Sequence, residues 1–239
     1  MSVIHTDSVS KKFGDIQAVK NLSISVEEGQ LFGFIGPNGA GKTTSINILT
    51  GQETPSSGEC RVMGLDPVKK SKEVRKKVGI LPEREDPPSF MTPREYLEFV
   101  CSVRGVVETG SRIKEWADLL SFNELLDTLN KSLSKGQKQK IMVAQAFIHE
   151  PELVFIDEPL INLDPVMQER LKSFFVDYVG EGNTVFLSTH VLSLADEICS
   201  HIGILEEGEL VVSGEKSDVK KEDETLSDTF LRVVDDKSY

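Results

Sequence analysis

Apolar residues along this chain follow two patterns that predict two kinds of strand. The continuous runs at 31–35, 153–156 and 184–187 are typical of strands buried on both faces, as in a parallel sheet. Residues 1–30 contain alternating segments, such as 21–26, which predict half-buried antiparallel strands. The chain is therefore expected to combine a parallel sheet with a separate antiparallel part.

The stretch 84–150 has a helical period instead. Thr92 is a predicted N-cap, with Pro93 at the first helical position, Glu95 completing a capping box and Gly105 ending the helix. These patterns predict a mostly helical insertion into an α/β fold. The apolar positions expected to face the core are Tyr96, Phe99, Val100 and Val103 in this helix, Ile113, Trp116, Leu119 and Leu120 in a second, and Leu125, Leu126 and Leu129 in a shorter third.

Together with the remaining sequence patterns, these features divide one predicted domain into four parts. A helix is expected over 42–49, a hairpin over 202–212 that turns at Glu207 and Gly208, and an amphipathic stretch over 226–231. The four parts are an antiparallel β subdomain (1–30 with part of 51–65), an α/β core (31–83 and 151–215), a helical subdomain (84–150) and a C-terminal tail (216–239).

The segment 36–44 carries the most informative motif. It fits the phosphate-loop pattern G-x-x-x-x-G-K-[ST], with Gly36, Gly41, Lys42 and Thr43 at the required positions. It lies between a predicted buried strand and a predicted helix, where backbone N–H groups and the helix dipole point toward one anion. Lys42 is expected to reach the β- and γ-phosphates of a nucleotide, and the Thr43 hydroxyl to ligate Mg²⁺.

Two carboxylates directly follow the buried strand predicted at 153–156. Asp157, at the end of this strand and beside a phosphate loop, is placed to hold Mg²⁺. Glu158 is then placed to accept a proton from an attacking water, a contribution of about 10²–10⁴-fold to a reaction rate. Because many surface turns also carry paired acids, this interpretation depends on the loop at 36–44.

The segment 133–137 predicts a second anion site. Ser134 and Gln137 form a capping box that opens a helix running to about His149. Free N–H donors, the helix dipole and the cation of Lys135 would favour an anion there. The alternative is that Ser134 only caps its helix.

Composition narrows the class of protein. The net charge of −12 over 239 residues argues against nonspecific binding to nucleic acid. No apolar run approaches the roughly 20 residues that span a bilayer, the N-terminus lacks a signal-peptide pattern, and three scattered cysteines are typical of reduced thiols in a cytosolic protein. A basic cluster at 69–77 is either a contact for anionic lipid or a solvated helical face.

In their order and spacing, these motifs resemble those of the nucleotide-binding subunit of ATP-binding cassette (ABC) proteins, over nearly the whole chain. GPNGAGKTT at 36–44 resembles the Walker A motif, LSKGQ at 133–137 the signature motif LSGGQ, and LVFIDEP at 153–159 Walker B with its catalytic glutamate. LDP at 163–165 resembles the D-loop, and STH at 188–190 the histidine switch. The resemblance implies a RecA-like phosphate-loop core with a mostly parallel sheet, an N-terminal antiparallel β subdomain and a helical subdomain insertion.

The resemblance also implies an Mg²⁺-dependent ATPase and assigns a role to each matching residue. Glu158 would be the general base, His190 would sense the γ-phosphate, and Glu83 would assist catalysis. Thr43, Glu83 and Asp157 would hold Mg²⁺. The residues expected to bind ATP are Phe13 (stacked on adenine), Gly36, Asn38, Gly39, Ala40, Gly41, Lys42, Thr43 and Thr44, with Ser134, Gly136 and Gln137 contributed to the ATP of a partner subunit.

The chain departs from the family pattern at three places. Glu83 stands where the family normally has glutamine, which keeps an oxygen ligand for Mg²⁺ but loses an amide donor and adds negative charge. Lys135 replaces a glycine of the signature motif. Residues 160–162 (Leu-Ile-Asn) replace a smaller and more polar stretch, in which Asn162 can take the positive φ of a glycine.

The resemblance further implies partners and a location. Two ATPase subunits, expected to form a homodimer, would close around ATP and power separate transmembrane permease subunits that dock on 84–94 and the helical insertion. The chain would then be cytoplasmic and peripheral on the inner face of the cell membrane, without a nucleic-acid partner. Its tail resembles subunits of export systems. The alternatives are a soluble ABC ATPase that does not transport, or a regulatory cassette with low turnover.

Overall fold

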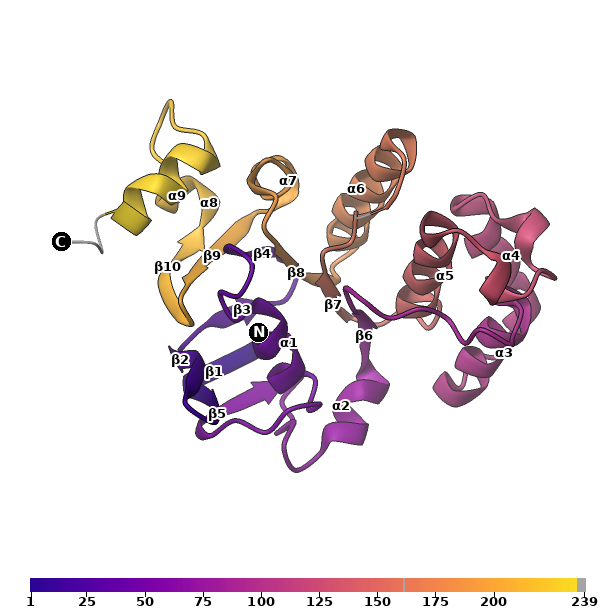
Figure 1. The fold of residues 1–239 in the computed structure, drawn as a ribbon, viewed down its shortest axis with the longest axis horizontal. Helices are drawn as coiled ribbons and strands as arrows, with labels where there is room; N and C mark the ends of the chain where they lie inside the picture. Colours follow the sequence, from indigo (N-terminus) through magenta and orange to yellow (C-terminus); the bar gives the residue numbers. More distant parts are fainter. Residues whose placement is uncertain (161, 236–239) are drawn as a thin grey trace.

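A computed structural model describes residues 1–160 and 162–235 of the chain (Figure 1). Within those residues, the strands are β1 (Ser2–Phe13), β2 (Ile16–Leu22), β3 (Ser25–Glu27), β4 (Leu31–Ile35), β5 (Ser57–Val62), β6 (Val78–Leu81), β7 (Leu153–Asp157), β8 (Thr184–Thr189), β9 (His201–Glu206) and β10 (Glu209–Glu215). The helices are α1 (Lys42–Leu49), α2 (Ser71–Lys77), α3 (Pro93–Arg104), α4 (Thr109–Leu119), α5 (Lys135–Phe147), α6 (Pro165–Gly180), α7 (Leu192–Ile198), α8 (Lys216–Val219) and α9 (Leu226–Asp235), with 3-10 turns η1 (Asn123–Leu125) and η2 (Asn130–Ser132).

The sheet has a parallel and an antiparallel part. Strands β9, β4, β8, β7 and β6 are neighbours in that order, and every pair among them is parallel. Strand β1 pairs antiparallel with β2, β3 and β5. Helices α3, α4 and α5 gather at one end of the molecule, beyond β6 (Figure 1). The predicted fold class, with its parallel core, antiparallel β part and helical insertion, is confirmed.

Helix α1 packs between the antiparallel strands and one face of the parallel sheet. Ile46, Ile48 and Leu49 are buried there in one core with Val62 of β5 and Phe155 of β7. Burial of an aliphatic side chain of this size stabilises the fold by roughly 1.5–3 kcal/mol. This core therefore fixes the start of α1 beside the end of β4.

The other face of the parallel sheet is covered by α6 and α7, and its core continues into the helical insertion. Leu171 of α6 is buried with Leu187 of β8 in this core. Phe147 of α5 lies 5.8 Å from the ring of Trp116 in α4 and packs edge-on against Tyr178 of α6, 5.1 Å away between centroids. The aromatic contacts therefore attach the insertion to the sheet.

Local signals predicted several element ends correctly. Helix α1 spans 42–49 as expected. Helix α3 starts at the capping box of Thr92 and Glu95 and ends at Gly105, whose φ of 73° is left-handed. Strands β9 and β10 form the expected hairpin, and both turn residues, 207 and 208, have positive φ values of 47° and 84°.

The face that α3 buries differs from the prediction. Phe99 and Val103 are each 58% exposed, whereas Leu97 and Cys101 are fully buried beside Val100. Two overlapping stripes on this helix have helical spacing, so periodicity alone does not distinguish them. The core lies on the side of Leu97, and tertiary packing decides which stripe it covers.

Two further expectations are wrong in detail. Residues 21–26 are not one strand, because β2 ends at Leu22 and β3 begins at Ser25 after a positive φ of 47° at Asn21. The third helix expected in the insertion, around 125–129, is replaced by two separate 3-10 turns, η1 and η2. Within the described residues, no helix has both the length and the apolar character needed to cross a bilayer.

The histidine that follows α5 is held neutral by its surroundings. His149 Nε2 lies 3.3 Å from the carbonyl oxygen of Val78, to which it donates, and its buried Nδ1 has no hydrogen-bond partner among the described residues. Burial, with a smaller contribution from the charge of Arg104, lowers the pKa of His149 to about 4.

We predict that His149 makes the protein acid-sensitive. Between its ordinary pKa of 6.5 and about pH 4, the unfolded chain binds a proton that the folded chain does not, so stability falls as the pH falls. The expected slope is about 1.4 kcal/mol per pH unit. His149→Gln, which keeps a donor toward Val78, should flatten the slope in urea unfolding measured from pH 7 to pH 4. Parallel slopes for both proteins would contradict this assignment.

Candidate functional site

The parallel register of the sheet brings four strand ends to one edge. Strand β4 pairs with β8 so that Ile35 lies beside Thr189, and β8 pairs with β7 so that Ser188 lies beside Asp157. Strand β6 lies on the far side of β7 and leads to Glu83. Ligands of open parallel sheets bind at this carboxyl edge, so the residues that follow these strands form the candidate site.

Two glycines let the loop between β4 and α1 pass close to other backbone. Gly41 has a φ of 102°, and a Cβ at this position would lie 2.3 Å from the carbonyl oxygen of Ala18. A Cβ on Gly36 would lie 2.2 Å from the carbonyl oxygen of Leu205. Real Cβ atoms do not approach backbone oxygens so closely, and only glycine tolerates the φ of Gly41 readily. The loop geometry therefore requires glycine at both positions.

Lys42, the first residue of α1, turns back over this loop. Its side chain is buried, and its ammonium group donates to the carbonyl oxygens of Gly36 at 2.7 Å and Pro37 at 3.1 Å. Burial lowers the pKa of Lys42, while the negative charges of three nearby carboxylates, Glu158 foremost, oppose that shift. The lysine thus lies in a partly desolvated, acidic surrounding.

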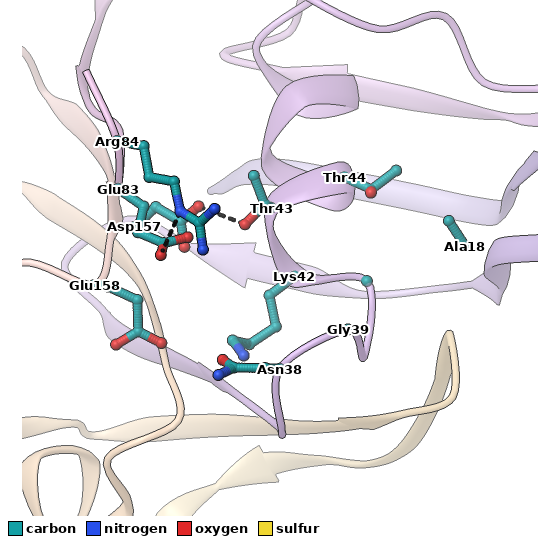
Figure 2. A pocket seen from close by; sticks show the side chains of 11 residues that line it. Ala18, Asn38, Gly39, Lys42, Thr43, Thr44, Glu83, Arg84, Asp157 and Glu158 are labelled. Atoms are coloured by element: carbon teal, nitrogen blue, oxygen red, sulfur yellow. Dashed lines mark hydrogen bonds and ion pairs between the residues drawn. The ribbon is translucent and has the colours of Figure 1, made fainter. Parts of the chain in front are cut away.

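The loop, the start of α1 and the strand ends enclose a cavity of about 250 Å³ (Figure 2). Of the predicted residues, Gly36 and Ala40 belong to the loop without lining the cavity. The cavity is lined by Ala18, Asn38, Gly39, Gly41, Lys42, Thr43, Thr44, Glu83, Arg84, Asp157 and Glu158. The fold therefore brings most of the predicted nucleotide and metal residues to one place.

Asp157 offers oxygen ligands beside the start of α1. One carboxylate oxygen accepts from the Thr43 hydroxyl at 2.7 Å, and the other accepts from the Ser188 hydroxyl. Burial raises the pKa of Asp157, and the two hydroxyl donors only partly offset this shift. The described residues contain no group of three or more His, Cys, Asp or Glu side chains suited to a metal. A metal ion held here would therefore depend on ligands such as phosphate oxygens.

Glu158 is held by the end of β8 in a strained backbone conformation. Its φ is 52°, which is uncommon for a residue other than glycine. One carboxylate oxygen accepts from the Thr189 hydroxyl at 3.0 Å. The other lies 2.8 Å from the backbone nitrogen of His190 and 2.6 Å from its ring Nδ1. These contacts orient the carboxylate at the edge of the cavity, and residues in sparsely populated backbone regions cluster at functional sites.

The structure does not bring every predicted residue to this cavity. Phe13, at the end of β1, is 46% exposed and does not line it. The Lys11 ammonium lies 4.7 Å from the centroid of the Phe13 ring, a cation–π contact. The stacking of Phe13 on adenine remains a prediction.

The signature-motif residues also lie outside the cavity. Ser134 and Gln137 form the expected capping box at the start of α5. Gly136 is required there because a Cβ would lie 2.5 Å from the carbonyl oxygen of Asn162, which has the anticipated positive φ of 65°. Ile161, in the unusual stretch before the D-loop, lies outside the described residues.

Sequence reasoning missed residues that complete the site. It did not assign Ser188 and Thr189 as hydrogen-bond partners of the two acidic residues, although two hydroxyl residues ending a buried strand were a usable signal. It also did not place Ala18 or Arg84 at the cavity. Both come from segments without a motif, so only the folded arrangement reveals them.

Comparison with known proteins identifies the family. Residues 19–161 of the chain match the protein family described as "ABC transporter". This chain belongs to the ABC transporter family. It is 33% identical over 88% of its length to the bacitracin transport ATP-binding protein BcrA of Bacillus licheniformis, 69% of which it covers. It spans only 60% and 42% of the length of two other curated relatives.

Solved structures of ABC proteins share the fold. An ATP-binding subunit of an ABC transporter matches 98% of this chain and 100% of its own, at a TM-score of 0.92 and 25% identity. A dimeric ATP-binding cassette in a post-hydrolysis state, bound to ADP and phosphate, matches 89% of this chain and 98% of its own at a TM-score of 0.81. Its 24% identity shows a common fold alone.

We predict that Thr189 orients the carboxylate of Glu158 in this member of the ABC transporter family. Thr189→Val keeps the shape of the side chain but removes the hydroxyl, which leaves one buried oxygen of Glu158 without its donor. We expect ATP hydrolysis to fall roughly tenfold to a hundredfold with ATP affinity unchanged. Thr189→Ser, which keeps the hydroxyl, is the matched control. Hydrolysis by Thr189→Val at the wild-type rate would refute the role.

Proposed function

We propose that this chain is the ATP-hydrolysing subunit of an exporter, which pairs with a second ATPase subunit around ATP and drives separate transmembrane permease subunits. The observation that carries the proposal is the meeting, at one cavity, of Lys42, Asp157 and Glu158. His190 does not line this cavity, but its ring Nδ1 lies 2.6 Å from a carboxylate oxygen of Glu158. A cation for phosphates, an acidic metal ligand and an oriented base are the parts that phosphoryl transfer to water requires.

The residues divide the chemistry between them. Lys42 and the backbone of 38–43 bind the phosphates, and Thr44 assists. Glu158 accepts the proton of the attacking water while Thr189 and His190 keep its carboxylate in place. When bound, Mg²⁺ neutralises charge on the phosphates; its ligands would be Thr43 and Asp157, whose oxygens lie 2.7 Å apart, with Glu83 as a further oxygen donor. Such a site, with few carboxylates and phosphate ligands, suits Mg²⁺.

The position of the signature motif supports pairing of two subunits. Ser134, Gly136 and Gln137 cap and begin α5 but do not line the cavity that holds Lys42. The N-terminus of α5 would then serve as an anion site for the ATP of a second copy. The homodimer is therefore the simplest arrangement that uses both sites.

A groove between the α/β core and the helical insertion offers a docking surface for a permease subunit. It encloses about 540 Å³. It lies beside the segment 84–94 and is lined by residues that include Arg75, Glu85, Tyr96 and Arg104. Arg94 itself is engaged by Asp127, with its Nε 2.8 Å from a carboxylate oxygen. We therefore centre the proposed contact on the groove beside this segment.

The relatives support the proposed role in transport and the proposed location. BcrA is named a bacitracin transport ATP-binding protein, which supports a role in transport, and we propose that the direction is export. Docking to a permease would hold the chain at the inner face of the membrane as a peripheral cytoplasmic subunit. Two alternatives make different predictions about ATP turnover. A soluble ABC ATPase outside transport would hydrolyse ATP independently of a permease, and a regulatory cassette would hydrolyse it very slowly. The oriented pair of Glu158 and His190 favours turnover.

The dimer model predicts a trapped state. Glu158→Gln should lower hydrolysis by about 10²–10⁴-fold because the proton acceptor is lost, while ATP still binds. Size-exclusion chromatography with Mg²⁺ and ATP should then show a dimer. Lys42→Ala, which loses the phosphate-binding cation, should stay monomeric under the same conditions. A Glu158→Gln protein that remains monomeric at every ATP concentration would exclude the shared site.

The docking groove makes a separate prediction. Glu85→Arg reverses an exposed charge at the groove and should lower the fraction of the chain recovered with membranes that contain its permease by severalfold. ATP binding should not change. Glu124→Arg, which alters an exposed glutamate of the same insertion outside the groove, is the matched control. Equal membrane recovery of both variants and the wild type would place the contact elsewhere.

A further inference from the structure

Arg84 is a cation at the nucleotide cavity that no sequence motif indicates. It follows Glu83, and both residues line the cavity together with Asp157 and Thr43. The Arg84 Nε donates to a carboxylate oxygen of Glu83 at 3.0 Å, while the Arg84 side chain is 86% exposed and that of Glu83 is 30% exposed. Figure 2 shows the Arg84 side chain folded over Glu83 rather than directed away from it.

The charges of the cavity explain why such a cation matters. Three carboxylates line it, those of Glu83, Asp157 and Glu158, and Lys42 is the other lining cation. The negative charge of Glu83 reaches Lys42 and Asp157, since it contributes to raising the pKa of each. An unpaired carboxylate at this position would repel a phosphate, whereas an arginine-paired one is neutral overall.

The geometry leaves donors free for a ligand. Only the Nε of Arg84 is used by Glu83, and within the described residues neither terminal nitrogen of the guanidinium has a hydrogen-bond partner. The other carboxylate oxygen of Glu83 likewise has no donor among those residues. Guanidinium groups bind phosphate oxygens with two parallel N–H donors, so the pair offers a phosphate donor and a remaining oxygen ligand side by side.

We propose that Arg84, held in place by Glu83, binds the terminal phosphate of ATP in its own subunit. The pair would then supply together the donor and the oxygen that a single neutral amide supplies: the arginine donates to the phosphate, and the second carboxylate oxygen of Glu83 would be available to Mg²⁺ when it is bound. Arg84 is a phosphate-binding residue and Glu83 also positions it. This inference rests on the proposed function and names a residue that distinguishes ATP from ADP.

Equilibrium binding of fluorescent ATP and ADP analogues in EDTA tests the role without metal or turnover. Arg84→Ala should weaken ATP binding roughly tenfold, as expected for a lost hydrogen bond to a charged group, and ADP binding less than twofold. Arg84→Lys should recover only part of the loss. In Glu83→Gln/Arg84→Ala the loss should shrink because no unpaired carboxylate remains. Lys69→Ala, which alters an exposed cation paired with Asp66 outside the cavity, should change neither affinity.

The outcomes separate this inference from the proposed function. If Arg84→Ala keeps the wild-type ratio of ATP to ADP affinity while Lys42→Ala loses binding, the role of Arg84 is wrong and the ATPase assignment stands. A similar loss for both nucleotides upon Arg84→Ala also overturns the assignment to the terminal phosphate. If the wild-type chain itself binds neither nucleotide, the proposed function fails.

Discussion

The parallel pairing of β4, β8, β7 and β6 is the constraint on which the site depends. Backbone hydrogen bonds set the register that puts Ser188 beside Asp157 and Thr189 beside Ile35. A slip of one residue would turn every side chain of a strand to the opposite face. The Ser188 hydroxyl would then leave Asp157, and Glu158 would lose its partner in Thr189. The chemistry at the carboxyl edge is thus held by main-chain bonds far more than by contacts among the site residues.

Two charged groups at that edge of the sheet are not fully compensated by their surroundings. Burial raises the pKa of Asp157 and lowers that of Lys42, so desolvation disfavours the charged form of both groups. A bound metal ion and phosphates would supply the opposite charges that each of them lacks. Such a site favours the ligand-bound state over the empty state, because the ligand offsets the unfavourable desolvation of these two charged groups that folding has already imposed. The Glu83–Arg84 pair extends the same principle to a position where the family normally has an uncharged amide.

The parts that the sequence predicted well are those fixed by neighbours in the chain. The phosphate loop, the capping boxes of α3 and α5 and the hairpin at 207–208 all depend on residues that are close to one another in the sequence. The acidic pair Asp157 and Glu158 was predictable because it ends a continuous apolar strand. The family resemblance added what spacing alone does not contain, namely the roles expected of Glu83 and His190 and the proposed pairing of two subunits.

The sequence by itself determined the fold class, the phosphate loop and the identity of the acidic residues, because local pattern and backbone chemistry specify them. Only the tertiary structure decided which stripe of α3 is buried, that Thr189 holds Glu158, and that Arg84 returns over Glu83 to the cavity. The reason is physical. The buried stripe of a helix with two apolar stripes, and the partner of a hydroxyl at a strand end, are set only when distant segments pack together. No local sequence pattern specifies which distant segment will be the partner.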